Sequence, residues 1–172
     1  PLAAIRAEFI GSNFGIPLDF LGLGAGWRID DLFYLTLLHG VLPRPATSGT
    51  DLEAISPIWE ALSRFGVGQA EWHPYWRNQQ LVEVTPATVK ASLYLRRAGA
   101  GPARALLIVS NLSTRQETTA QLTLHLLDPE PTAGPGAAAV CHDAVSHERL
   151  ALEGIRLQVP LQPMGARLVV IE

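Results

Sequence analysis

The sequence is poor in several residue types, and each shortage excludes a class of protein. Among its 172 residues there is one cysteine, Cys141, so no internal disulfide framework can form. No apolar run approaches the roughly 20 residues that a membrane helix needs. The 13 cationic residues form no basic block, and the net charge is −3. We therefore expect neither a membrane nor a nucleic acid as a partner.

The apolar content is sufficient for a folded core. Hydrophobic residues make up 48% of the chain and charged residues 17%, which is typical of globular proteins and not of disordered ones. The length predicts one or two domains.

The hydrophobic pattern changes at residues 71–78, EWHPYWRN. Apolar residues recur at helical spacing before this seam and alternate after it. The change predicts two units: residues 1–78, with helices and one strand, and residues 79–172, an antiparallel β-sandwich. Trp72, Tyr75 and Trp76 could stack on sugar rings, but their place at the seam favours packing between the two units.

The first unit has the pattern of an incomplete α/β layer, with helices but only one predicted strand. Residues 16–21 are short, apolar and bounded by glycines, which is typical of a buried strand. We expect a helix that ends at His39, a loop over 41–49, and a helix over 50–65 that Pro57 kinks or restarts. Because one strand cannot form a sheet, this unit is expected to be an incomplete remnant.

The second unit shows the alternation of half-buried strands. Turn signals rich in Gly, Pro, Asn and Ser separate the runs, and this pattern favours a sandwich. The expected strands cover residues 89–95, 105–109, 122–126, 155–161 and 168–171.

Two residues of the first unit are candidates for substrate binding. Asp19 lies near the end of the predicted buried strand, where a carboxylate can serve sugar chemistry or simply bind loop amides. Trp27 follows the glycine loop 22–26, where an aromatic side chain can face a ligand. That loop lacks the spacing of a nucleotide-binding fingerprint.

Residues 141–148 hold five groups that could bind a metal, but their spacing fits no standard zinc site. The same segment also fits a strand, a polar turn and a second strand. We therefore expect no metal and no other cofactor. His39 is interpreted as a residue at a helix end, where it interacts with the helix dipole, rather than as a catalytic group.

Several segments together resemble the last part of glycoside hydrolase-like proteins, in which a (β/α)8 barrel precedes a β-sandwich. In the first unit these segments are FGIPLDFL (14–21), LLHGV (37–41), Ile58-Trp59, FGV (65–67) and EWHPYWRN (71–78). In the second unit they are ALLIVSNLS (105–113), AVSHERL (144–150) and MGARLVVI (164–171).

The resemblance implies an α+β chain: the truncated end of a TIM-like barrel followed by a sandwich that braces it. It implies carbohydrate processing by a parent protein whose catalytic carboxylates lie on earlier barrel strands, so no residue here is assigned as catalytic. The expected partners are carbohydrate and the upstream barrel segment, and the chain alone is expected to be inactive. The alternative is a non-catalytic carbohydrate-binding module, with Tyr94 as its clearest aromatic, or a structural module.

Overall fold

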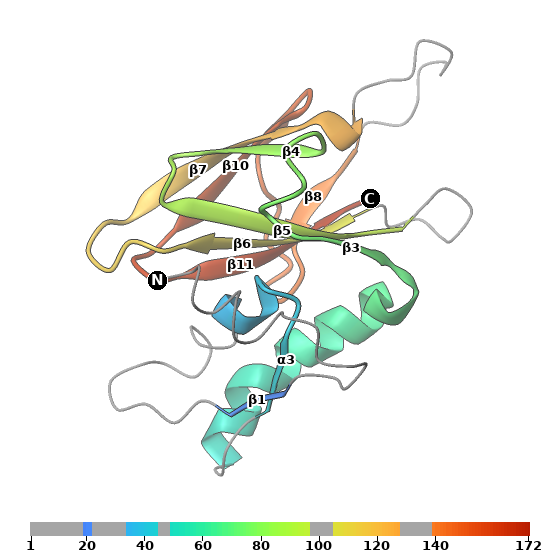
Figure 1. The fold of residues 1–172 in the computed structure, drawn as a ribbon, viewed down its shortest axis with the longest axis vertical. Helices are drawn as coiled ribbons and strands as arrows, with labels where there is room; N and C mark the ends of the chain where they lie inside the picture. Colours follow the sequence, from blue (N-terminus) through green and yellow to red (C-terminus); the bar gives the residue numbers. More distant parts are fainter. Residues whose placement is uncertain (1–18, 22–33, 45–48, 97–104, 128–138) are drawn as a thin grey trace.

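The computed structural model describes residues 19–21, 34–44, 49–96, 105–127 and 139–172. This part of the chain is α+β and rich in antiparallel strands. Two sheets lie face to face, and helix α3 (Gly49–Phe65) covers the outer side of one of them (Figure 1). No helix within the described ranges is long and apolar enough to cross a membrane.

The two sheets form the predicted sandwich, and all their strand pairings are antiparallel. The four-stranded sheet has the order β4 (Val82–Thr85), β7 (Thr118–Leu124), β10 (Arg156–Leu161) and β9 (Leu152–Glu153). The five-stranded sheet has the order β3 (Glu71–His73), β5 (Val89–Leu95), β6 (Ala105–Asn111), β11 (Ala166–Ile171) and β8 (Cys141–Asp143). Short 3-10 turns, η1 (Val67–Gln69) and η2 (His125–Leu127), precede β3 and follow β7.

Strand β6 connects the two hydrophobic cores of the protein, because it is buried on both faces. Leu107 and Val109 point into the core between the sheets, while Leu106 and Ile108 pack toward the helical layer. A strand buried on both sides needs no polar alternation, which accounts for the continuous apolar run in the sequence.

The helical layer packs on the outer face of the five-stranded sheet. Ile55, Ile58 and Leu62 of α3 are almost fully buried, and they share a core with Leu106 and Leu168 of the sheet. Their spacing of three and four residues places them on one face of the helix.

Helix α3 differs from the sequence prediction at Pro57. The helix is continuous from Gly49 to Phe65, so of the two alternatives predicted at Pro57, a kink or a restart, the restart is wrong. The Ser56 hydroxyl donates to the Leu52 carbonyl at 2.7 Å, one turn earlier, instead of capping a new helix. Leu52 lies three residues before Ile55 but is exposed, so it is not part of the buried face of the helix.

The sequence predicted a loop over 41–49, but part of this segment is a strand. Leu42–Arg44 form β2, which pairs in parallel with β1 (Asp19–Leu21). Apart from β3, which belongs to the sandwich, the first unit therefore contains two described strands and not one. Pro43 lacks an N–H, but a proline is tolerated in a strand that has a free edge, and within the described ranges β2 pairs on one side only.

Candidate functional site

The residues with the most specific polar contacts lie where the helical layer meets the sandwich. Ser92 of β5 is fully buried, and its hydroxyl donates to the carbonyl of Leu38 at 2.7 Å. The same oxygen accepts the backbone N–H of Tyr75 at 2.9 Å. One hydroxyl therefore satisfies two backbone groups from segments far apart in the sequence.

His39 lies next to this hydroxyl and is 2% exposed. Its Nδ1 is 2.8 Å from the carbonyl oxygen of Leu35, so Nδ1 must carry the proton, since a carbonyl only accepts. Nε2 lies 3.4 Å from the Tyr75 hydroxyl, and the Trp76 ring stacks on the imidazole with 6.0 Å between the ring centroids. Leu35 belongs to the helical turn 34–37, so His39 lies at a helix end as predicted, and its contact there is a hydrogen bond to a carbonyl; the interaction with the helix dipole stays a prediction.

Trp72 completes the junction by packing against a glycine. Gly40 has a φ of +76°, and a Cβ at this position would lie 3.0 Å from the Trp72 indole. On its other side Trp72 contacts the ring of Tyr94, with 4.6 Å between centroids. The interpretation of the seam aromatics as junction residues is therefore confirmed for Trp72 and Tyr75, which pack against the core under α3.

Asn78 fixes the end of the seam. Its side-chain amide donates to the carbonyl of Ala91 at 2.9 Å, where β5 extends beyond β3 and has no strand partner on that side among the described residues. Sequence reasoning missed both Asn78 and Ser92. Ser92 lies outside every segment singled out in the sequence, Asn78 was noted only as the end of 71–78, and each has its role because the tertiary fold brings backbone groups within reach.

The junction leads directly to one of the two predicted substrate-binding residues. Leu38, His39 and Gly40 are followed by Val41 and then β2, whose Leu42 is the register partner of Asp19. Asp19 opens β1 and lies two residues before its carboxyl end at Leu21. Trp27 lies outside the described residues, and the roles of Asp19 and Trp27 in substrate binding stay predictions.

The segment 141–149, considered above for metal binding, forms a strand followed by a tight polar turn. Oδ1 of Asp143 accepts the N–H groups of Val145 and Ser146 at 2.9 and 2.8 Å, and Oδ2 lies 3.7 Å from Arg167. Arg167 also forms an ion pair with Glu148. Within the described ranges no three His, Cys, Asp or Glu side chains are placed to hold a metal ion.

Cys141 is buried at the start of this segment, and burial raises the pKa of its thiol to about 11. A thiol with this pKa carries almost no thiolate at neutral pH. Cys141 therefore acts as a small core residue and not as a nucleophile.

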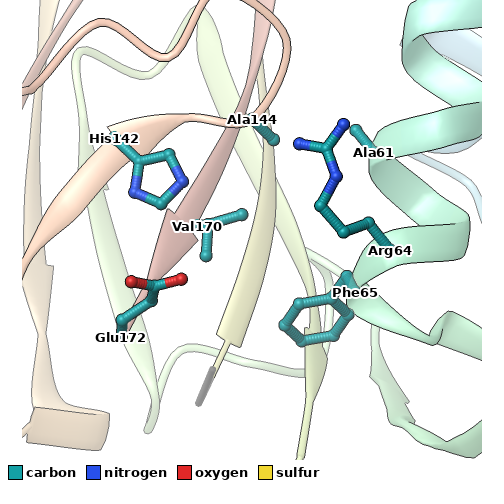
Figure 2. Close-up of a pocket in the computed structure, with 7 residues that line it drawn as sticks. All are labelled: Ala61, Arg64, Phe65, His142, Ala144, Val170 and Glu172. Carbon is teal, nitrogen blue, oxygen red and sulfur yellow. The ribbon is translucent and has the colours of Figure 1, made fainter. Parts of the chain in front are cut away.

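A small cleft of about 70 Å³ lies between the end of α3 and the β8–β11 edge of the sheet (Figure 2). Its polar side chains are Arg64, His142 and Glu172, around an apolar floor that includes Val170. The cleft holds a single acidic side chain, whereas most glycosidases use two. It has room for a few water molecules or a small ion, and not for a sugar.

Comparisons with known proteins identify a fold and no sequence family. No family model matches the chain, and no curated protein matches it. Among solved structures, a GH27 β-L-arabinopyranosidase from Geobacillus stearothermophilus matches with a TM-score of 0.57 and 14% identity, over 86% of this chain and 31% of that one. The Thermotoga maritima α-fucosidase matches with TM-scores of 0.34 in complex with a mechanism-based inhibitor and 0.35 in a second structure. The sequence identity is 12% in both cases. The inhibitor complex matches over 84% of this chain and 34% of the fucosidase, and the second structure over 92% and 40%.

The first of these similarities shows that the chain shares its fold with part of a glycoside hydrolase. This chain spans about a third of the length of the matched arabinopyranosidase. At 14% identity the similarity concerns the fold alone, and the fucosidase scores are too low to add to it.

Proposed function

We propose that this chain is the C-terminal part of a glycoside hydrolase-like protein, in which residues 79–172, together with β3 and the segment after it (71–78), brace a parallel-strand domain to which the preceding residues belong. The observation that carries the proposal is the buried junction. Leu38, His39 and Gly40, which lead into β2, are held by Ser92, Tyr75 and Trp72. The sandwich thereby fixes the start of a parallel strand.

Two further observations support this role. Strands β1 and β2 pair in parallel, as the strands of a (β/α)8 barrel do, and a helical turn precedes β2. The fold similarity to the arabinopyranosidase extends over 86% of this chain, so it includes part of the helical layer as well as the sandwich.

The sandwich would influence the proposed sugar site through the pairing of β2 with β1. Because Leu42 pairs with Asp19, a shift of residues 38–41 would also move Asp19, which we propose contacts the sugar together with Trp27. Catalytic carboxylates would come from barrel strands outside this chain. A brace of this kind needs directional contacts, since apolar packing alone does not define a position as sharply as a hydrogen bond does.

The test compares the 172-residue chain with the protein translated from the whole open reading frame that contains it. Both are assayed against a panel of aryl glycosides. We expect turnover by the longer protein only, and we expect Asp19→Asn to reduce that turnover without lowering the melting temperature. Hydrolysis by the 172-residue chain alone would contradict the proposal, and so would a reading frame that encodes no upstream β/α repeats.

The alternative of a carbohydrate-binding module built on Tyr94 is not favoured. Tyr94 is half-buried beside Trp72, and burial raises the pKa of its hydroxyl. A sugar-stacking platform needs an accessible ring face, and Tyr94 packs against the core beneath the helical layer.

A further inference from the structure

A groove of about 360 Å³ runs along one side of the sandwich, between β4, β5 and the loop after β3. All four residues of β4 line it, together with residues 89–91 of β5. Side chains alternate along a strand, so a groove lined by consecutive residues follows the edge of that strand and not one of its faces. The volume lies within the range of small-molecule sites.

The edge of β4 presents free backbone groups to this groove. The N–H of Leu124 donates toward β10, to Ile155, so Leu124 and Leu122 direct their backbone groups away from β4. Their partners Val82 and Val84 therefore direct theirs away from β7, toward the open edge. The Val82 N–H is already bound to the Asn78 carbonyl at 3.0 Å, which leaves the N–H and the C=O of Val84 for a ligand.

The side chains around these groups supply donors and acceptors of balanced charge. Lys90 and Glu83 cancel one another, and Gln79 and Thr85 are neutral and exposed. The Lys90 ammonium donates to the Ala87 carbonyl at 2.9 Å and keeps two further N–H groups. A lining of this kind favours neither an anion nor a cation, and it suits hydroxyl groups, which both donate and accept.

A peptide added as an extra strand would fit this edge less well. Strand addition gains affinity from a row of main-chain hydrogen bonds. Beyond Val84 the chain turns at Pro86, which has no N–H, and the Val82 N–H is occupied, so β4 offers a single N–H without a partner among the described residues. One such pair is enough to orient a small polyol but not to hold a strand.

We propose that this groove is a binding site for a neutral mono- or disaccharide, separate from the β1–β2 pair. The Val84 backbone and the Lys90 ammonium are its main hydrogen-bonding groups. The site goes beyond the bracing role and does not depend on it, because it would bind sugar whether or not the parent protein hydrolyses glycosides.

The test is an NMR titration of the 172-residue chain with the methyl glycosides of glucose, galactose and xylose. Backbone amide shifts report on Val84. Because Lys90 is the only lysine, selective labelling with ¹³C,¹⁵N-lysine adds a single side-chain reporter in the groove and leaves its N–H groups intact. We expect at least one glycoside to shift both signals with the same saturation curve.

Matched variants locate the site. We expect Lys90→Met to weaken binding about tenfold and Lys90→Arg to retain it, because a charge-assisted hydrogen bond is lost only in the first. Val84→Pro removes the free N–H where a strand edge tolerates proline, and it should weaken binding to a similar degree, with its melting temperature recorded to confirm folding. Thr119→Ala, in a groove of about 400 Å³ formed by residues 117–119 and 160–162, should leave binding unchanged.

Three results would overturn the proposal. The first is that no glycoside shifts Val84 or Lys90. The second is that Lys90→Met and Val84→Pro bind as tightly as the unmodified chain. The third is that a capped Val-Thr-Val-Thr peptide shifts the same signals when the glycosides do not, which would make the edge a strand-addition site. None of these outcomes bears on aryl-glycoside turnover.

Discussion

The two faces of the five-stranded sheet are buried in different ways. The face toward the four-stranded sheet is covered by an apolar core of Val, Leu, Ala and Ile, which also contains Cys141. The face toward α3 is also apolar at its centre, but polar groups border it. Ser92 and His39 are both almost fully buried there and hydrogen-bonded.

The two faces therefore contribute differently: one mainly stabilises the sandwich, and the other mainly positions the neighbouring segment. Burial of apolar area is non-directional, so the inner core stabilises the sandwich without fixing any one neighbour. A buried hydroxyl that binds two backbone groups allows one arrangement, because any other leaves polar groups unsatisfied. The inner face therefore holds the domain together, and the outer face sets where residues 38–41 lie.

The largest effect is expected from Leu107→Ala, in the inner core. Leu107 is fully buried between the sheets, and its truncation should lower the free energy of unfolding by about 2–5 kcal/mol. Urea unfolding followed by circular dichroism would measure the loss. A matched Leu52→Ala change, on the exposed side of α3, should cost less than about 0.5 kcal/mol. Equal losses at the two sites would show that the inner core is not the main source of stability.

A smaller but more local effect is expected from Ser92→Ala. This change leaves the Leu38 carbonyl and the Tyr75 N–H without their buried partner, at a cost of about 1–3 kcal/mol. Amide hydrogen exchange, followed by NMR, would measure where the structure loosens. Exchange should accelerate first at residues 34–41 and 75–78, before the sandwich strands, because the hydroxyl holds these two segments.

The matched control for this prediction is Ser63→Ala, on the exposed side of α3. It removes the same hydroxyl from a position outside the junction, so it should change the free energy of unfolding by less than about 0.5 kcal/mol. Ser113 is a less suitable control, because its hydroxyl accepts the Gln116 N–H at 3.0 Å. If Ser92→Ala leaves exchange at residues 34–41 as slow as Ser63→Ala does, the Ser92 hydroxyl does not position that segment.

The sequence was sufficient to predict the sandwich, because its strands depend on a local pattern. Alternation over 89–95 and the apolar run over 105–109 correspond to β5 and β6, and both were predicted with nearly the right bounds. Strands β3 and β4 were missed, since each is only three or four residues long and lies at the edge of a sheet. Strand β2 was missed because two prolines outweighed its pairing with β1, which comes from a distant part of the chain.

The junction was predictable only in part. Its aromatic residues are conspicuous in the sequence, and their packing role followed from their place at the seam. The hydrogen bonds of Ser92 and Asn78 were not predictable, because their partners, Leu38 and Ala91, are backbone carbonyls that only the tertiary fold brings near. Whether Asp19 and Trp27 bind sugar stays a prediction.

The smallest effect is expected on the pH dependence of the free energy of unfolding, through Cys141 in the inner core. Burial raises the pKa of this thiol from 9.0 to about 11, so the folded state favours the neutral form more than the unfolded state does. The stabilisation is fully present below about pH 9 and is lost as the pH rises toward 11. Thermal unfolding measured between these values should show a decline that Cys141→Ala reduces, while tyrosine-linked losses common to both proteins remain. A decline of equal steepness in the two proteins would show that the thiol is not held neutral by the core.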